Sequence, residues 1–181
     1  MAKSKKGTIN PLGSFLADLG TGVFDVLGAT SVGASNVIKR ISGRTLTTEQ
    51  VLDVLEGIKI AQTQYTTEKN VENVLAKLLD PHFAVHRQYN IGGFLGLKID
   101  IDLNETVGIE IKLAKELTTT TIERLLGQII YYSKRKYGQK LIVLIVGTSK
   151  ESNTRVMEEL EEIIADDLDI YFRFMVVNPR K

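Results

Sequence analysis

The sequence predicts an α/β domain in which a mixed central sheet is flanked by helices. Three short runs of strand character follow Pro81, and the last two of them have the pattern of a β-hairpin. A clear helical periodicity comes next, and the wholly apolar run at residues 141–147 is typical of a central strand covered on both faces. The predicted order is α-β-β-β-α-β-α-β, preceded by an N-terminal helical part.

The composition of the chain indicates one domain with a short appendage. Its 181 residues are 43% hydrophobic, which is enough for a substantial core. The absence of cysteine excludes a disulfide framework and a thiolate zinc site, and it suits a reducing compartment, so we expect a cytoplasmic protein. A net charge of +1 favours no class of partner by itself, so any nucleic acid must bind a local basic patch.

Residues 1–45 are expected to form an apolar N-terminal arm in which glycines interrupt short helical patterns. The first pattern begins after the Asn10-Pro11 pair. Asp18, Asp25 and repeated glycines interrupt every apolar run, so a transmembrane helix or a signal peptide is not expected. We expect the arm to pack on the domain or on a neighbouring subunit. Packing on a neighbouring subunit would make the protein a homo-oligomer, which is the expected state. Contact of the arm with a membrane surface is the alternative.

Two amphipathic helices are predicted at the start of the main domain, residues 46–181. Thr47 or Thr48 can cap the first helix, because a threonine hydroxyl accepts a hydrogen bond from an unpaired N–H group of the first turn. The second helix follows from apolar residues at helical spacing between residues 67 and 79, and it ends before Pro81.

The strands and the remaining helices follow in regular order. The threonines at 118–121 can cap a helix whose apolar residues recur at i, i+3, i+4, i+7 and i+8, and Gly138 can end it. The predicted strands are 83–89, 97–103, 107–113, 141–147 and 170–177, and a last helix is predicted at 153–165.

Charged and apolar residues alternate along the predicted hairpin, whose sequence from residue 98 to residue 113 is KIDIDLNETVGIEIKL. Successive side chains of a strand point to opposite faces, so the apolar residues can face the core while the charged residues gather on the other face. The charged residues that can share this face are Lys98, Asp100, Asp102, Glu110 and Lys112.

The shortest hairpin that keeps both apolar faces on the core has a three-residue loop centred on Glu105. This register places Asp100 directly opposite Glu110. Opposed like charges destabilise a sheet by roughly 0.2–1 kcal/mol, whereas a divalent cation between them would make the pairing favourable. Lys112, on the same face, could stabilise an anionic transition state or help to hold an attacking water. The pattern has the geometry of metal-dependent phosphodiester hydrolysis, and a plain solvated hairpin face with a few weak ion pairs is the alternative.

Asp100, followed by Glu110-Ile111-Lys112 on the adjacent strand, resembles the PD-(D/E)XK nuclease superfamily, which has the restriction-endonuclease-like or Holliday-junction-resolvase-like fold. The resemblance covers roughly residues 66–177, and the proline of the family name is absent. It implies an αβββαβ core and a Mg2+- or Mn2+-dependent endonuclease that hydrolyses DNA. The segment before residue 66 has no counterpart in the family.

The resemblance also implies roles for individual side chains. Asp100 and Glu110 would hold the metal ion. Glu72, at the border of the apolar stripe of the preceding helix, would complete the metal shell directly or through water, and Glu68, one turn earlier, is the fallback. Lys112 would support the nucleophile.

The helix after the third strand carries further candidates. The family places a glutamine and a tyrosine on this helix, and Gln128, Tyr131 and Tyr132 match them, with Gln128 expected to orient the site or the substrate. Helical spacing also forms a polar stripe on this helix, which could line a phosphate backbone or be an ordinary solvated face. The expected DNA contacts, two of them outside this helix, are Arg87, Lys98, Arg124, Tyr131 and Arg135.

Several alternatives stay open. Asp102 could be a second metal ligand, but it lies one step nearer the loop and is expected to be solvated. Asp100-Ile101-Asp102 also matches the metal-binding D-x-D of nucleotide-sugar transferases, although no nucleotide-binding strand-loop-helix precedes it. His82 and His86 have no ligand-spaced partner. The alternative function is a catalytically inactive nucleic-acid-binding or assembly module with the same fold, which oligomerises through its N-terminal arm.

Overall fold

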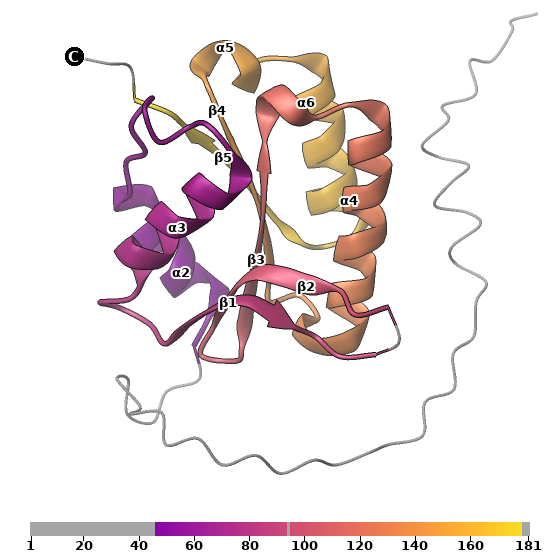
Figure 1. Cartoon of the computed structure of the whole chain (residues 1–181). Helices are drawn as coiled ribbons and strands as arrows, with labels where there is room; N and C mark the ends of the chain where they lie inside the picture. Colours follow the sequence, from indigo (N-terminus) through magenta and orange to yellow (C-terminus); the bar gives the residue numbers. More distant parts are fainter. Residues whose placement is uncertain (1–45, 94, 179–181) are drawn as a thin grey trace, which may run out of the picture. The chain divides into compact units, whose positions relative to one another are not determined.

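The computed structural model describes residues 46–93 and 95–178, so the predicted arm at 1–45 and its oligomer contacts lie outside the described residues. The described chain forms one five-stranded mixed sheet of order β1-β2-β3-β4-β5 (Figure 1). The first three strands are antiparallel neighbours, and β3, β4 and β5 are parallel. The predicted mixed α/β architecture is thus confirmed. The strands are β1 (Val85–Asn90), β2 (Lys98–Leu103), β3 (Val107–Leu113), β4 (Leu141–Gly147) and β5 (Tyr171–Val176).

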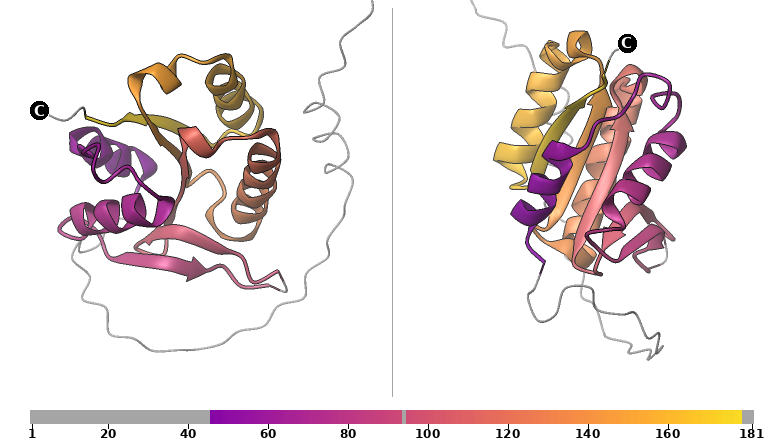
Figure 2. Two further views of the ribbon diagram at one scale, coloured as in Figure 1. Left: turned by 45° about the horizontal axis from the view of Figure 1, so that its top comes forward. Right: turned by 90° about the vertical axis from the view of Figure 1, so that its left-hand side faces the viewer.

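Helices cover both faces of the sheet (Figure 2). α2 and α3 lie on one face, and α4 and α6 lie on the other. The buried apolar residues of α2 and α3 form one hydrophobic cluster with residues of β2, β3 and β4. The helices are α2 (Thr48–Gly57), α3 (Glu68–Leu79), α4 (Thr119–Tyr132), α5 (Ser149–Ser152) and α6 (Arg155–Glu161), with a 3-10 turn η1 (Ala114–Glu116) and π-helical turns η2 (Ser133–Tyr137) and η3 (Glu162–Asp167).

Threonine side chains begin the main helices where the sequence predicts them. Thr47, Thr67 and Thr118 each accept a hydrogen bond from the backbone N–H three residues later, at 3.2–3.4 Å. α4 continues into η2 and stops at Gly138, whose φ of 56° favours glycine. The caps therefore fix where α3 and α4 start, and these two helices flank the charged hairpin.

β4 is the interior strand that the apolar run predicts. All seven of its residues are buried, and it pairs in parallel with β3 on one side and β5 on the other. No helix within 46–93 or 95–178 is both long enough and apolar enough to cross a membrane.

The helix predicted at 153–165 has different bounds in the structure. α5 and α6 are separate, and Asn153 between them has φ −100° and ψ 37°, outside the helical region. Thr148 caps α5, and the Thr154 hydroxyl accepts a hydrogen bond from Met157 N at the start of α6. The predicted helix therefore corresponds to α6 together with η3, and the short α5 before it, which begins at its own threonine cap, was not predicted.

Candidate active site

The charged hairpin opens beside Asp100. The predicted register and its three-residue turn are confirmed, because Leu103 lies opposite Val107. The ladder ends one step before Asp100 would meet Glu110, so the predicted direct pair is wrong. Opposed carboxylates would destabilise the ladder at this step. The Asp100 carboxylate instead receives a hydrogen bond from the Ile111 backbone N–H at 2.8 Å, so a side chain replaces the missing strand contact.

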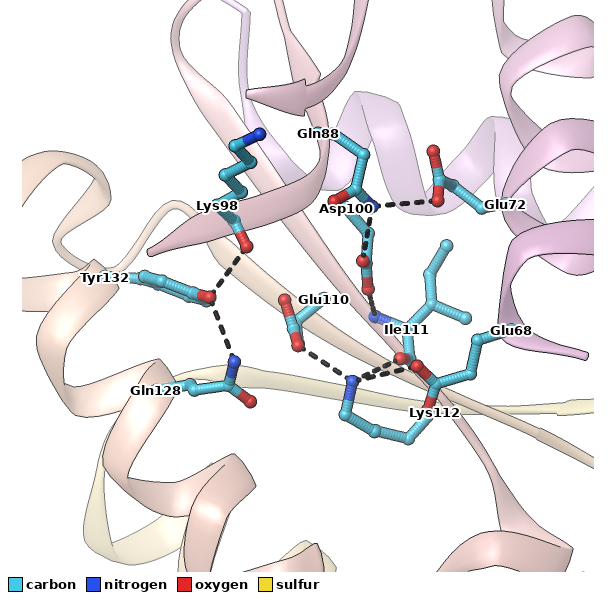
Figure 3. Close-up of polar contacts among 10 residues, drawn as sticks. All are labelled: Glu68, Glu72, Gln88, Lys98, Asp100, Glu110, Ile111, Lys112, Gln128 and Tyr132. Carbon is cyan, nitrogen blue, oxygen red and sulfur yellow. Dashed lines mark hydrogen bonds and ion pairs between the residues drawn. The ribbon is translucent and has the colours of Figure 1, made fainter. Parts of the chain in front are cut away.

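Gln88 connects Asp100 to α3. Its side-chain amide donates to Asp100 Oδ1 at 3.1 Å and to Glu72 Oε2 at 2.9 Å (Figure 3). The Gln88 backbone has φ 48°, a conformation that is uncommon for a residue other than glycine. Because of this conformation, Gln88 and its neighbour Arg87 both reach Glu72, which successive residues of a regular strand could not do. Sequence reasoning missed Gln88, since a strand pattern gives no sign of a left-handed residue.

Glu110 and Lys112 lie together on β3, as predicted. Lys112 Nζ donates to Glu110 Oε1 and to the Ile111 carbonyl, each at 2.9 Å, and to Glu68 Oε2 at 3.4 Å. The second carboxylate oxygen of Glu110, Oε2, is buried and has no hydrogen-bond partner among the described residues. Buried polar atoms are almost always paired in native structures, so this oxygen is the site's unusual feature.

The charges at the site are unbalanced. Burial, and then the nearby Asp100 carboxylate, raise the pKa of Glu110 to about 8. Burial also raises the pKa of Asp100 and of Glu68 above their ordinary values. Burial alone would lower the pKa of Lys112, but the three carboxylates around it outweigh that effect and raise it. One ammonium thus faces three carboxylates, and the cluster is short of positive charge.

Glu72 and Glu68, one turn apart on α3, have different surroundings. Glu72 is only 4% exposed, and its two oxygens receive hydrogen bonds from Arg87 Nε at 2.7 Å and from Gln88. Glu68 instead contacts Lys112. Both line an open pocket beside Asp100. Glu68, the fallback in the sequence, is therefore in direct contact with the Lys112 cluster, whereas Glu72 reaches Asp100 through Gln88.

Hydrogen bonding fixes the orientation of Gln128 on α4. The hydroxyl of the fully buried Tyr132 donates its proton to the Lys98 carbonyl at 2.8 Å (Figure 3). The same hydroxyl can therefore only accept from Gln128, whose Nε2 lies 3.3 Å away. Gln128 Oε1 is left buried and without a hydrogen-bond partner among the described residues. Tyr132 interacts electrostatically with Glu110 and Asp100, so this second unpaired oxygen belongs to the same region.

Asp102 does not join this cluster, and the expectation that it is solvated is wrong. It is fully buried, and its carboxylate binds Lys136 Nζ at 2.7 Å and the Tyr137 hydroxyl at 2.6 Å. Both partners come from η2, which follows α4. The five hairpin charges therefore do not form one group, and the Lys98 side chain also points away from Glu110 in Figure 3.

Of the residues predicted to contact DNA, some have exposed side chains and others already bind a residue of the protein. Lys98, Arg124 and Arg135 are exposed. Arg87 is in the ion pair with Glu72, although its side chain is 39% exposed. Tyr131 is half-buried, and its hydroxyl donates to a carbonyl of the β1–β2 loop.

The carboxylate oxygens of the site suit a hard divalent cation, although they are few. Within the described ranges, no group of three or more His, Cys, Asp or Glu side chains is arranged to hold a metal ion. Asp100 and the unpaired Glu110 Oε2 are nevertheless oxygen donors of the kind that Mg2+ and Mn2+ prefer, in a cluster short of positive charge. Mg2+ commonly binds through one or two carboxylates, with water and substrate phosphates completing its shell.

Comparisons of the chain with protein-family models, with curated proteins and with solved structures find no match.

Proposed function

We propose that the protein is a Mg2+- or Mn2+-dependent nuclease of the PD-(D/E)XK class, which hydrolyses phosphodiester bonds within DNA. Support comes from Asp100, Glu110 and Lys112, which meet where β2 and β3 separate, with α3 and α4 on either side. The order of elements from α3 to β4 is also that of the αβββαβ core of this class.

The observation that carries the proposal is the unpaired Glu110 Oε2. A buried carboxylate oxygen without a partner costs free energy, and here a second carboxylate, Asp100, adds repulsion. A hairpin with only a structural role would gain nothing from this arrangement, and a bound cation would remove both penalties. A cation held by Asp100 and Glu110 would act as a Lewis acid on the scissile phosphate and lower the pKa of an attacking water.

The other residues of the site would act through hydrogen bonds. Lys112 Nζ is held by Glu110 and the Ile111 carbonyl, and it can donate to the negative charge that develops on a phosphate oxygen in place of its long contact with Glu68. Gln128 Oε1 can accept a hydrogen bond from an attacking water, because Tyr132 turns this oxygen away from itself. In this proposal Glu72 positions Asp100 through Gln88 instead of binding the metal directly.

Incubation of the purified full chain with supercoiled plasmid in Mg2+ or Mn2+, with and without excess EDTA, tests the proposal. We expect nicking and linearisation that EDTA stops. Asp100→Asn and Lys112→Ala should each reduce the rate by at least about 100-fold, the effect typical of losing one electrostatic contact to a transition state. Lys77→Ala, which removes an exposed lysine of α3, is the matched control and should leave the rate unchanged.

Two outcomes would reject the proposed site. Cutting that needs no metal, or that survives both substitutions, would place the chemistry elsewhere. Binding of DNA without cleavage under every condition would favour the inactive binding module instead.

A further inference from the structure

The β1–β2 loop, residues 91–97, exposes an apolar side chain at the edge of the domain. Leu95 is 49% exposed, the largest value among the exposed large hydrophobic residues in the described part of the chain. A leucine in this position gives up the stabilisation of burial. The loop lies beside α4, the helix that carries Gln128 (Figure 1).

Two successive tyrosines of α4 hold both ends of this loop. Tyr131 donates to the Gly92 carbonyl at 3.0 Å, and Tyr132 donates to the Lys98 carbonyl at 2.8 Å. The loop is also closed on itself by a bond from Ile91 N to the Leu97 carbonyl at 3.3 Å. The two ends of the loop are therefore held by the same helix that orients Gln128.

Gly93 allows the loop to lie directly on α4. Its φ is 84°, and a Cβ atom there would collide with the Tyr131 hydroxyl and lie 2.9 Å from Arg135 Nη2. The Arg135 guanidinium in turn lies 5.9 Å from the centre of the Tyr131 ring. The loop backbone, the aromatic ring and an exposed cation thus form one contact surface.

The loop and the second half of α4, with the turn after it, carry formal charges of one sign. Residues 89–99 and 124–140 contain no aspartate or glutamate. Lys136 is engaged with the buried Asp102. The basic side chains of these two segments that stay exposed are Lys98, Arg124, Lys134 and Arg135. An exposed apolar side chain on a loop whose contact with α4 includes an exposed arginine fits a partner that combines anionic groups with flat apolar surfaces, and nucleic acid with accessible bases has both.

We propose that Leu95 packs against base faces exposed at an interruption of duplex DNA, such as a nick, a gap or a branch, while Lys98 and Arg135 contact the flanking phosphates. This inference rests on the nuclease function proposed above and specifies its substrate class. Bases of a continuous duplex are stacked, and unstacking them costs free energy, whereas an interruption offers base faces at little cost. A lipid surface is disfavoured, because Leu95, the one exposed large hydrophobic residue among the described residues of the loop, supplies little apolar area for membrane binding.

Binding in EDTA tests this inference without cleavage. Fluorescence anisotropy of the full chain is measured on three DNAs of equal length: a continuous duplex, the same duplex with a short gap, and a four-way junction. We expect the wild type to bind the gapped or branched DNA at least tenfold more tightly than the continuous duplex. Leu95→Ser should remove most of this preference, and Leu78→Ser, at a leucine of α3 that is 41% exposed, should keep it.

Further measurements separate the contributions and the alternatives. Arg135→Gln should weaken binding to all three DNAs and lower the slope of log affinity against log salt by about one. A 2-aminopurine placed at the gap should change in fluorescence with the wild type and with Leu78→Ser, but not with Leu95→Ser. Equal affinity of the wild type for the three DNAs, or equal effects of the two serine substitutions, would overturn the inference. So would Leu95-dependent sedimentation with phosphatidylserine vesicles and unchanged DNA binding, which would indicate a membrane contact.

The two proposals fail separately. Plasmid cleavage without any preference for interrupted DNA would reject the role of Leu95 and leave the nuclease intact. A Leu95-dependent preference for interrupted DNA without cleavage would support the proposed role of Leu95 and reject the proposed nuclease function.

Discussion

The aspartates at the two ends of β2, Asp100 and Asp102, have opposite electrostatic surroundings. Asp102, near the turn, is fully buried, and its carboxylate receives hydrogen bonds from Lys136, Tyr137 and the Glu105 backbone N–H. Asp100, two residues earlier, lies where the strands part, and burial raises its pKa. One aspartate has its charge neutralised by partners, and the other lies in a cluster with excess negative charge.

We expect this difference to separate a stabilising role from the proposed catalytic role within one strand. The Asp102 end ties β2 and the hairpin turn to η2, and Lys136 also lies 3.6 Å from the centre of the Tyr89 ring of β1. The Asp100 end includes Glu110, whose Oε2 is unpaired, and it therefore stores unfavourable free energy. The Asp102 end, whose carboxylate is hydrogen-bonded, can hold the backbone in place. The Asp100 end can then keep its carboxylate oxygens in position to bind a ligand.

Asp102→Ala should have the largest effect on stability. Truncating one member of a buried ion pair costs about 3–5 kcal/mol, because the partner loses its counter-charge in a site that excludes water. Urea denaturation followed by circular dichroism measures the loss. Asp100→Ala is the matched control on the same strand, and it should cost much less, since it also relieves repulsion with Glu110. Equal losses for the two variants would contradict the contrast between the two ends.

Glu110→Gln should remove a pH dependence of stability in metal-free protein. The pKa of Glu110 is about 8 in the folded state against 4.5 for an ordinary glutamate, so the folded protein binds more protons between these values. The resulting stabilisation is fully present below pH 4.5 and is lost as the pH rises to about 8. The slope from this group is at most about 1.4 kcal/mol per pH unit.

The measurement is urea denaturation of both proteins in EDTA from pH 5 to pH 9. The free energy of unfolding of Glu110→Gln should increase relative to that of the wild type as the pH rises. A constant difference between the two proteins across this range would show that the Glu110 carboxyl titrates normally.

Mg2+ or Mn2+ should stabilise the wild type at pH 8, where the Glu110 carboxyl is about half ionised. A ligand at 100 times its dissociation constant stabilises the folded state by about 2.7 kcal/mol. Glu110→Gln should lose most of this shift, because it removes the donor with the free oxygen. Asp102→Asn should keep the shift, whatever its basal stability. A metal-induced shift of the melting temperature that is equal in all three proteins would indicate a cation site elsewhere.

The sequence predicted the main elements and the contact between Glu110 and Lys112 on β3, because both depend on local patterns. Threonine caps and apolar periodicity place α3 and α4, and strand alternation places Glu110 beside Lys112. It favoured Glu72 over Glu68, but both lie on the same side of α3 one turn apart, so helical spacing does not show which of them contacts Lys112. In the structure two side chains of β1, Arg87 and Gln88, bind Glu72, and Glu68 contacts Lys112.

Non-local partners explain what the sequence could not predict. Asp102 has the same local pattern as Asp100, but Tyr137, 35 positions later, takes its carboxylate out of the site. The unpaired oxygens of Glu110 and Gln128 likewise depend on which neighbours the fold supplies. Alternation gave the register of the hairpin correctly, but it contains no information on where the ladder ends.

Tyr132→Phe should have the smallest effect on stability and a specific effect on activity. The substitution removes one hydrogen bond to the Lys98 carbonyl, which costs about 1 kcal/mol. It also removes the acceptor that fixes the Gln128 amide, so the amide can rotate and its oxygen is no longer held free. We expect the cleavage rate at saturating plasmid to fall about tenfold, the effect of losing roughly 1.4 kcal/mol of transition-state stabilisation, with little change in the DNA concentration for half-maximal rate. Tyr131→Phe, on the adjacent position, keeps the Gln128 contact and loses only the bond to the loop. It should therefore leave the rate on continuous plasmid near that of the wild type, and equal rate losses for the two variants would mean that α4 acts on the site only through the loop.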